Sequence, residues 1–207
     1  MEHIGIIGKA AVAAFKKNGF DAEYFDNSKE AKISIYEMIP DGASVGFGGS
    51  TTIEEMDLQQ MLLDKGCIIY DHAKGITLDE KLALRRMQLQ SDVFLTSSNA
   101  ITRDGNLYNI DAIGNRVAAM IFGPKQVIVV VGINKLVSNV EAARERVKTI
   151  SAPINNIRLK MANPCVETGV CNDCHSPARI CKAEVILHRK PSATAIKVVI
   201  IGEEMGY

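Results

Sequence analysis

Residues 127–131 read Val-Ile-Val-Val-Val and are followed by Gly132. Consecutive β-branched residues favour a strand, and an apolar run without polar alternation is typical of a strand that is buried on both faces. The stretch Ala195 to Ile201, near the end of the chain, has the same character. Strands of this kind occur almost only in parallel sheets that helices cover on both faces. These two runs therefore predict an α/β protein.

Short apolar stretches alternate with helical patterns on either side of these two runs. Strands are expected at 22–25, 44–47, 67–70, 93–96 and 107–110, and helices at 6–17, 28–38, 77–90, 114–121 and from about residue 52. Residues 77–80 and 138–141 have the capping-box pattern that marks the start of a helix. The apolar residues after the second box share one helical face: Val140, Ala143, Val147 and Ile150. The alternation predicts a three-layer α/β/α fold with a largely parallel sheet.

The composition indicates an ordinary globular protein and excludes several classes. The chain has 207 residues, of which 47% are hydrophobic, so a single domain over residues 1–207 is expected. Its 24 basic and 24 acidic residues cancel, which argues against binding nucleic acid or a membrane surface through bulk charge. The N-terminus lacks a signal-peptide pattern, and no apolar stretch reaches the roughly 20 residues of a membrane span. We expect a cytoplasmic protein that binds neither nucleic acid nor a membrane, with homo-oligomerisation left open.

The first of two polar loops follows the strand expected at 44–47 and reads Gly48-Gly49-Ser50-Thr51-Thr52. Ligands of open parallel sheets sit beyond the carboxyl ends of the strands. Glycines let the backbone approach a ligand, and a helix N-terminus favours an anion, so this loop suits a phosphate or a carboxylate. It matches neither the Walker pattern nor the dinucleotide-binding fingerprint. The alternative is helix capping by the hydroxyl side chains, completed by Glu54 or Glu55.

The second polar loop follows the strand expected at 93–96. Its candidate ligand-binding residues are Ser97, Ser98, Asn99, Thr102, Asn115 and Arg116. Some of these polar residues can have a purely structural role. Asp104-Gly105 is a hairpin-turn signal, and Asp111 is close enough in sequence to pair with Arg116. The density of polar residues between two apolar strands nevertheless exceeds what turns require. We expect a ligand site here as well.

Several of these motifs together resemble the LUD (lactate utilisation) domain family. They are the glycine loop from Gly46 to Glu54, the run Ser97-Ser98-Asn99-Ala100-Ile101-Thr102, the triplet Asn109-Ile110-Asp111, residues 114–120 and Phe122-Gly123-Pro124. The resemblance implies a fold similar to the ribose-phosphate isomerase, glucosamine-phosphate isomerase and CoA-transferase superfamily. It also implies that the turn around Gly48 and Gly49 holds a phosphate, CoA or carboxylate group of a small anionic metabolite.

The resemblance carries further expectations about activity and partners. Family members take part in oxidising lactate to pyruvate together with iron–sulfur partner proteins, so an oxidoreductase partner of that kind is expected. In the isomerase and transferase relatives a carboxylate performs acid/base or covalent work, which makes Glu54, Asp104 and Asp111 the candidate catalytic residues. The rival class is a non-catalytic binding or regulatory module that docks onto an oxidoreductase.

Four of the five cysteines crowd into a segment at residues 161–183. Cys165, Cys171, Cys174 and Cys181 have the spacing C-x5-C-x2-C-x6-C, and turn-favouring residues between them allow all four thiolates to reach one centre. Four such thiolates suit a 4Fe–4S iron–sulfur cluster or a structural zinc. The spacing matches neither common ferredoxin run nor the paired zinc knuckle. An iron–sulfur cluster is the first expectation, zinc is the alternative, and redox-active or unligated thiols stay open. Cys67 lies in an apolar strand and is expected to be an inert core thiol.

The lactate-pathway members that this chain resembles differ from it in one respect. The chain has its own cysteine segment and lacks the ferredoxin-like cysteine runs of the larger lactate-pathway component. It therefore resembles a free-standing subgroup, and the identity of the organic acid stays open.

Overall fold

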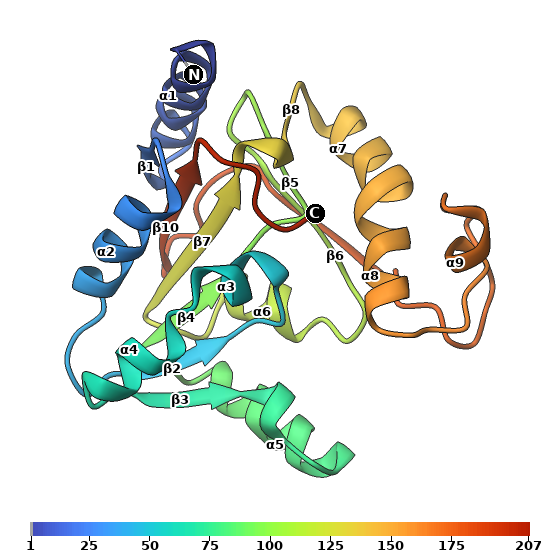
Figure 1. The fold of residues 1–207 in the computed structure, drawn as a ribbon, viewed down its shortest axis with the longest axis horizontal. Helices are drawn as coiled ribbons and strands as arrows, with labels where there is room; N and C mark the ends of the chain where they lie inside the picture. The colour runs from blue at the N-terminus through green and yellow to red at the C-terminus, as the bar shows by residue number, and fades with distance from the viewer. Residues whose placement is uncertain (1) are drawn as a thin grey trace.

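The computed structural model describes residues 2–207 and centres on a sheet of six strands that all run parallel. The strands lie in the order β1 (Asp21–Phe25), β10 (Ala195–Ile201), β7 (Gln126–Gly132), β4 (Val93–Thr96), β2 (Ser44–Phe47) and β3 (Ile68–Asp71). Figure 1 shows them following one another from β1 to β3 across the molecule. The parallel sheet expected from the two apolar runs is confirmed, and those runs form two adjacent strands near its centre.

The apolar residues of β7 alternate between two cores, one on each face of the sheet. Ile128 and Val130 belong to the core that helices α2 (Ser28–Met38), α3 (Thr51–Met56) and α4 (Gln59–Asp64) cover. Val127, Val129 and Val131 belong to the core that α1 (Glu2–Lys17) and α6 (Asn115–Ile121) cover. Because both faces are buried, neither tolerates a polar residue, which explains the unbroken apolar sequence. The three-layer α/β/α arrangement follows.

A second, smaller sheet was not expected. Its four strands lie in the order β8 (Leu136–Val137), β5 (Ala100–Thr102), β6 (Leu107–Asp111) and β9 (Ala183–Leu187). β5 and β6 form an antiparallel hairpin, as the Asp104-Gly105 signal indicated. Gly105 has a φ of +82°, and a Cβ at this position would lie 2.7 Å from the backbone carbon of Ala14 in α1. The turn therefore needs glycine for its conformation and for its close contact with the first helix.

Residues 140–158 form one helical run with an irregular turn in its middle. It consists of α7 (Val140–Arg146), a π-helical turn η3 (Val147–Ser151) and α8 (Ala152–Arg158). The run begins one residue later than the expected capping box, because Asn139 rather than Ser138 caps it and accepts from the N–H of Ala142. The expectation that Ile150 shares the buried face of Ala143 was wrong: Ile150 is 40% exposed, since the wider π turn shifts the helical register.

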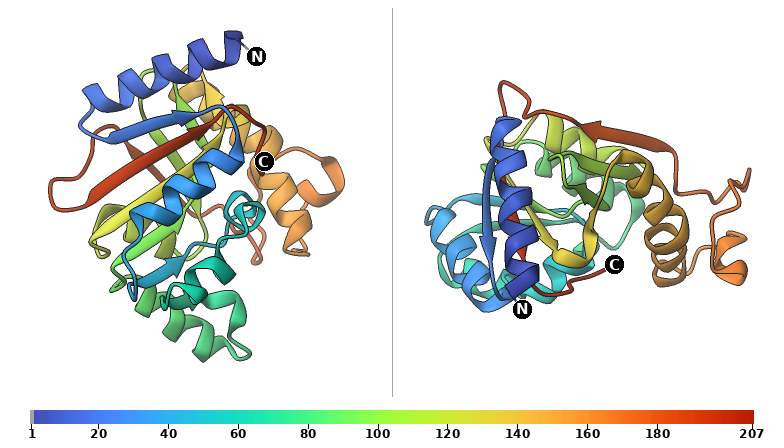
Figure 2. Two further views of the ribbon diagram at one scale, coloured as in Figure 1. Left: turned by 60° about the vertical axis from the view of Figure 1, so that its left-hand side comes forward. Right: turned by 90° about the horizontal axis from the view of Figure 1, so that it is seen from above.

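The remaining helices complete the layers and the cysteine segment. α5 (Leu78–Gln88) begins at the expected capping box of Thr77 and Glu80. The short helix α9 (Cys165–Thr168) opens the cysteine segment, which lies at one end of the molecule beyond α7 and α8 (Figures 1 and 2). Among residues 2–207, none of the helices has the length and apolar character that crossing a bilayer requires.

Candidate functional site

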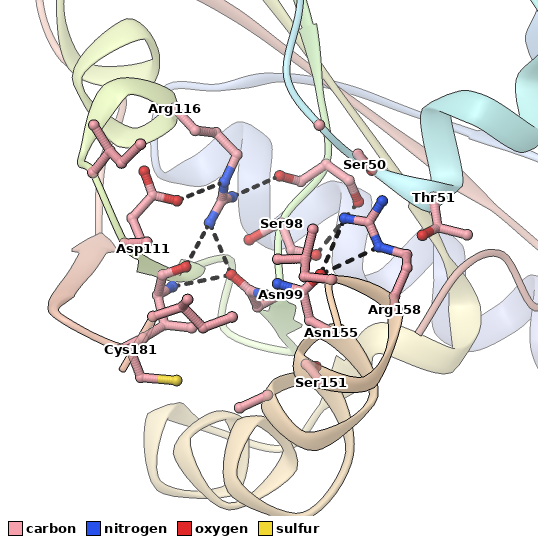
Figure 3. Close-up of a pocket in the computed structure, with 18 of the residues that line it drawn as sticks. Ser50, Thr51, Ser98, Asn99, Asp111, Arg116, Ser151, Asn155, Arg158 and Cys181 are labelled. Carbon is pink, nitrogen blue, oxygen red and sulfur yellow. Dashed lines mark hydrogen bonds and ion pairs between the residues drawn. The ribbon is translucent and has the colours of Figure 1, made fainter. Parts of the chain in front are cut away.

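A pocket of about 240 Å³ opens at the carboxyl ends of several strands of the parallel sheet. Its lining comes from the loops after β2, β3, β4 and β7, from the end of β6, from helices α5, α6 and α8, and from the cysteine segment. This is the edge of the sheet where ligands of α/β proteins bind. The two polar loops that the sequence singles out meet here (Figure 3).

The pocket brings together most of the residues proposed from the sequence. Its lining includes Gly49, Ser50, Thr51, Ser97, Ser98, Asn99, Asp111, Asn115 and Arg116. Outside the lining lie Gly48, Thr52, Glu54, Thr102 and Asp104. Glu54 stands beside it, 3.5 Å from Nη1 of Arg158. Asp104 is farther away, in the exposed β5–β6 turn, where its carbonyl accepts from Asn18. The structure therefore brings one of the three candidate acids, Asp111, into the pocket.

The glycine loop approaches its neighbours closely. The N–H of Gly48 donates to the carbonyl of Leu95 at 2.9 Å, and a Cβ on Gly48 would lie 2.9 Å from Oγ1 of Thr96. Ser50 is the N-cap residue of α3, yet its side chain makes no capping hydrogen bond. The Oγ1 of Thr51 is buried and has no partner among the described residues. Capping therefore does not account for the hydroxyl groups of this loop.

The polar groups of the second loop largely satisfy one another. The Oγ of Ser98 donates within the β5–β6 hairpin, to carbonyls that include Tyr108 at 2.9 Å. The Oδ1 of Asn99 accepts from the N–H of Ile110 at 3.0 Å and from Nη2 of Arg116 at 2.9 Å. These side chains build a fixed wall of the pocket.

Lys135 is a buried amine that the sequence analysis missed. It lies in the short helix η2 (Ile133–Lys135) directly after β7, is 4% exposed, and lines the pocket. Its Nζ donates to Oγ1 of Thr52 at 2.7 Å and to Oγ of Ser97 at 3.1 Å. Burial, reinforced by the charges of Arg146 and Arg116, lowers the pKa of Lys135 to about 7. The position after the central strand is a signal that could have found it.

Two further arginines face the pocket and were also missed. Arg158 on α8 is held by Tyr207, whose Oη lies 2.8 Å from its Nε, and by Asn155. Figure 3 shows Arg158 and Arg116 on two sides of Ser98 and Asn99. Arg85 on α5 has no hydrogen bond or ion pair within residues 2–207. Neither position carries a sequence signal, because each lies in the middle or at the end of a helix rather than beside a strand.

The comparisons with known proteins agree with this architecture. The family model of the LUD domain matches residues 8–201. The chain belongs to the LUD domain family. The solved structure of a DUF162 family protein from Deinococcus radiodurans is similar to this LUD domain with a TM-score of 0.52, covering 96% of this chain and 98% of that one. The two sequences are 14% identical, so this likeness concerns the fold alone. No match is found among curated proteins.

The cysteine segment of this LUD domain surrounds a second, small cavity. Cys165, Cys171, Cys174 and Cys181 all line it. Burial is the main cause that raises the pKa of the Cys181 thiol, to about 11. Within residues 2–207 no three His, Cys, Asp or Glu side chains stand close enough together to hold a metal ion as they are placed. Cys67 is buried elsewhere, 3.6 Å from the carbonyl of Pro40, as expected for a core thiol.

Proposed function

We propose that this LUD domain binds a small anionic metabolite, a carboxylate or a phosphate, in the pocket at the strand ends. The observation that carries the proposal is the charge of the lining. Four basic side chains face the pocket, namely Arg85, Arg116, Lys135 and Arg158. Among the described lining residues Asp111 is the one carboxylate, and it is paired with Arg116. An excess of positive charge in a partly closed space favours an anion.

The arginines differ in how much of their hydrogen-bonding capacity is free. All of the N–H donors of Arg116 point to protein acceptors, so this residue shapes the pocket. Arg158 is held through Nε and Nη2, while its Nη1 faces an exposed carboxylate, Glu54, at 3.5 Å. Arg85 has no partner within residues 2–207. Arg85 and Arg158 are therefore the residues proposed to contact the ligand, together with the unpartnered Oγ1 of Thr51.

The volume of the pocket and the name of the family suggest the class of metabolite. Pockets for drug-sized ligands occupy roughly 300 Å³ or more, so a pocket of about 240 Å³ suits a smaller molecule. The family is named after lactate utilisation, and a short hydroxy or keto acid fits this description. We propose a role in lactate or other organic-acid oxidation, or in a related redox pathway, with an iron–sulfur oxidoreductase as partner.

A non-catalytic binding module is the second candidate, and the state of Asp111 favours it. The carboxylate of Asp111 accepts from Nε of Arg116 at 3.0 Å and from the N–H of Val117 at 3.3 Å. With a protein donor on each of its oxygens, Asp111 serves to orient Arg116 and the start of α6. If the domain is an enzyme, the buried amine of Lys135 is better suited to proton transfer, since its pKa lies near neutrality.

Calorimetric titration with lactate, pyruvate and inorganic phosphate tests the proposal. Arg158→Gln and Arg85→Gln should each weaken binding of the preferred anion about tenfold or more, because each removes a hydrogen bond to a charged group. Arg86→Gln is the matched control, since Arg86 is the exposed neighbour of Arg85 and lies outside the pocket. Equal binding by all three variants, or no binding of any of the three anions, would contradict the proposal.

A further inference from the structure

We infer that Cys165, Cys171, Cys174 and Cys181 hold a thiolate-ligated metal centre, and that this centre supports one wall of the anion pocket. The inference does not depend on the identity of the anion. Its basis is the arrangement of the segment between α8 and β9, where the four thiols border a common space.

The cavity between the thiols is small. Its volume is about 10 Å³, which leaves no space for an organic ligand. Asn163 also lines the cavity and is 4% exposed. Its Nδ2 donates to Oδ1 of Asn156 at 2.6 Å and to the carbonyl of Ala178 at 2.9 Å, while its Oδ1 is buried and has no partner among the described residues. A buried oxygen without a partner is costly unless a cation, a water or a donor completes the site.

The main helical run presents a free carbonyl to this segment. In the π turn the N–H of Ala152 donates to the carbonyl of Val147, five residues earlier. The next bond in that pattern would join residue 153 to the carbonyl of Lys148, but residue 153 is proline and has no N–H. The N–H of Cys171 takes this carbonyl instead, at 2.8 Å. The helix thus fixes the backbone of one of the four cysteines.

Arg179 connects the backbone at Cys174 with the backbone at Cys181. Its Nη1 donates to the carbonyl of Cys174 at 2.7 Å, and its Nε donates to the carbonyl of Cys181 at 2.7 Å. The same guanidinium forms an ion pair with Asp173. A positive charge beside four thiolates offsets part of their negative charge, as the outer ligands of metal sites commonly do. The N–H of Asp173 lies 3.4 Å from Sγ of Cys171, in the geometry of the N–H···S contacts that stabilise a ligating sulfur.

Ligation requires the thiols to shift from their present positions, and the segment permits it. Between Thr168 and Ala183 the chain forms neither helix nor strand, so its backbone can close around a metal without breaking a regular element. In a tetrahedral zinc site with Zn–S distances of about 2.3 Å, the sulfurs approach one another to about 3.8 Å. A four-iron cluster needs a wider arrangement, because each thiolate binds a different iron. Both centres share the same ligand chemistry, and the visible spectrum separates them.

The two cavities have a common wall. Ala152, Ile180 and Cys181 line both of them. Lys182, the residue after Cys181, is hydrogen-bonded to a residue of the pocket: its N–H donates to the carbonyl of Asp111 at 3.0 Å. A metal bound to Cys181 therefore fixes Ile180 and the neighbouring backbone in the position that closes the anion pocket.

Metal analysis of the full chain, purified without oxygen, tests the inference. We expect either about four irons with sulfide and a broad absorption band near 400 nm, or about one zinc in a colourless protein. Cys174→Ser should lower the metal content at least fivefold. Cys67→Ser is the matched control, because it removes a buried thiol outside the cavity and should leave the content unchanged.

A second measurement covers the case in which the cysteine variant fails to fold. The metal-free chain is titrated with zinc alone, and separately with ferrous iron and sulfide, while amide exchange of residues 163–182 is followed. Saturation at the stoichiometry of one centre, with slower exchange in this segment, supports the inference. The absence of stoichiometric metal in both measurements overturns it, as does equal metal content in the Cys174 and Cys67 variants.

Discussion

Nε of Arg116 lies 3.0 Å from Oδ1 of Asp111, and the two side chains are 13% and 11% exposed. The remaining donors of the guanidinium go to the carbonyls of Ser97 and Ile110 and to the side chains of Asn99 and Asn109. One arginine therefore joins the loop after β4 to the end of β6. Together with the hydrogen bonds of Ser98 and Asn99 to β6, this side chain fixes one side of the pocket.

Replacing Arg116 should destabilise the protein rather than simply weaken ligand binding. Arg116→Ala removes the charged partner of Asp111 and leaves the carbonyls of Ser97 and Ile110 without this donor, which should cost about 3 kcal/mol of unfolding free energy. Arg116→Lys should recover little, because an ammonium cannot reach acceptors in so many directions. Urea unfolding measures both. A loss below about 1 kcal/mol for Arg116→Ala would show that the network is not a stabilising element.

The stability of the chain should depend on pH through Lys135. The pKa of Lys135 is about 7 in the folded protein and 10.5 ordinarily, so between these values the unfolded chain binds more protons. Stability from this group therefore rises with pH from about 7 to 10, by up to about 1.4 kcal/mol per pH unit. Lys135→Met removes this dependence. Its advantage over the natural chain should be largest at pH 7 and below and should shrink by pH 10, as urea unfolding at several pH values can measure.

Anion binding should be linked to proton uptake at the same amine. An anion in the pocket favours the charged form of Lys135, which raises its pKa, so affinity should fall as the pH rises above 7. Calorimetry in buffers with different ionisation enthalpies should show uptake of a fraction of a proton at pH 7 to 8. Binding without proton exchange, or an uptake that Lys135→Met preserves, would place the anion away from this residue.

Pro153→Ala tests the attachment of the cysteine segment to the helix. Alanine restores the N–H that proline lacks, so the carbonyl of Lys148 gains a helical partner that competes with the N–H of Cys171. We expect faster amide exchange at Cys171 and faster metal loss to a chelator, with thermal stability of the rest of the chain little changed. Pro191→Ala serves as the control, because Pro191 lines neither cavity.

Metal loading should change anion affinity through the shared wall. If the centre fixes Ile180 and Cys181, removing the metal should weaken anion binding several-fold, and adding metal back should restore it. This expectation joins both proposals. An unchanged affinity would overturn the inference that the metal centre supports a wall of the anion pocket.

The central strands were predictable because burial on both faces leaves a pattern in the sequence itself. Residues 127–131 and 195–201 can be assigned without knowing their partners. The second sheet was not predictable, because β5 and β8 have only three and two residues and depend on pairing across the chain. The face of Ile150 was mispredicted because a π turn leaves no periodic signal of its own.

The rule that ligands bind at strand ends predicted the loops of the pocket. It did not lead to the basic side chains. Gly49, Ser50 and Ser97 follow strands and were identified for that reason. Arg85 and Arg158 come from helices, and only the tertiary structure brings them to the same place. Lys135 also satisfies the strand-end rule, but it does not stand in a polar run as dense as those of the two loops.

The position of β10 has a consequence for synthesis of the chain. β10 is the last strand in the sequence, yet it lies between β1 and β7 and is the strand that pairs with β1. Residues 21–25 therefore have no neighbour in the sheet until residues 195–201 have left the ribosome. Parallel pairing over such a sequence distance is slow, so the contact between β1 and β10 forms late in folding.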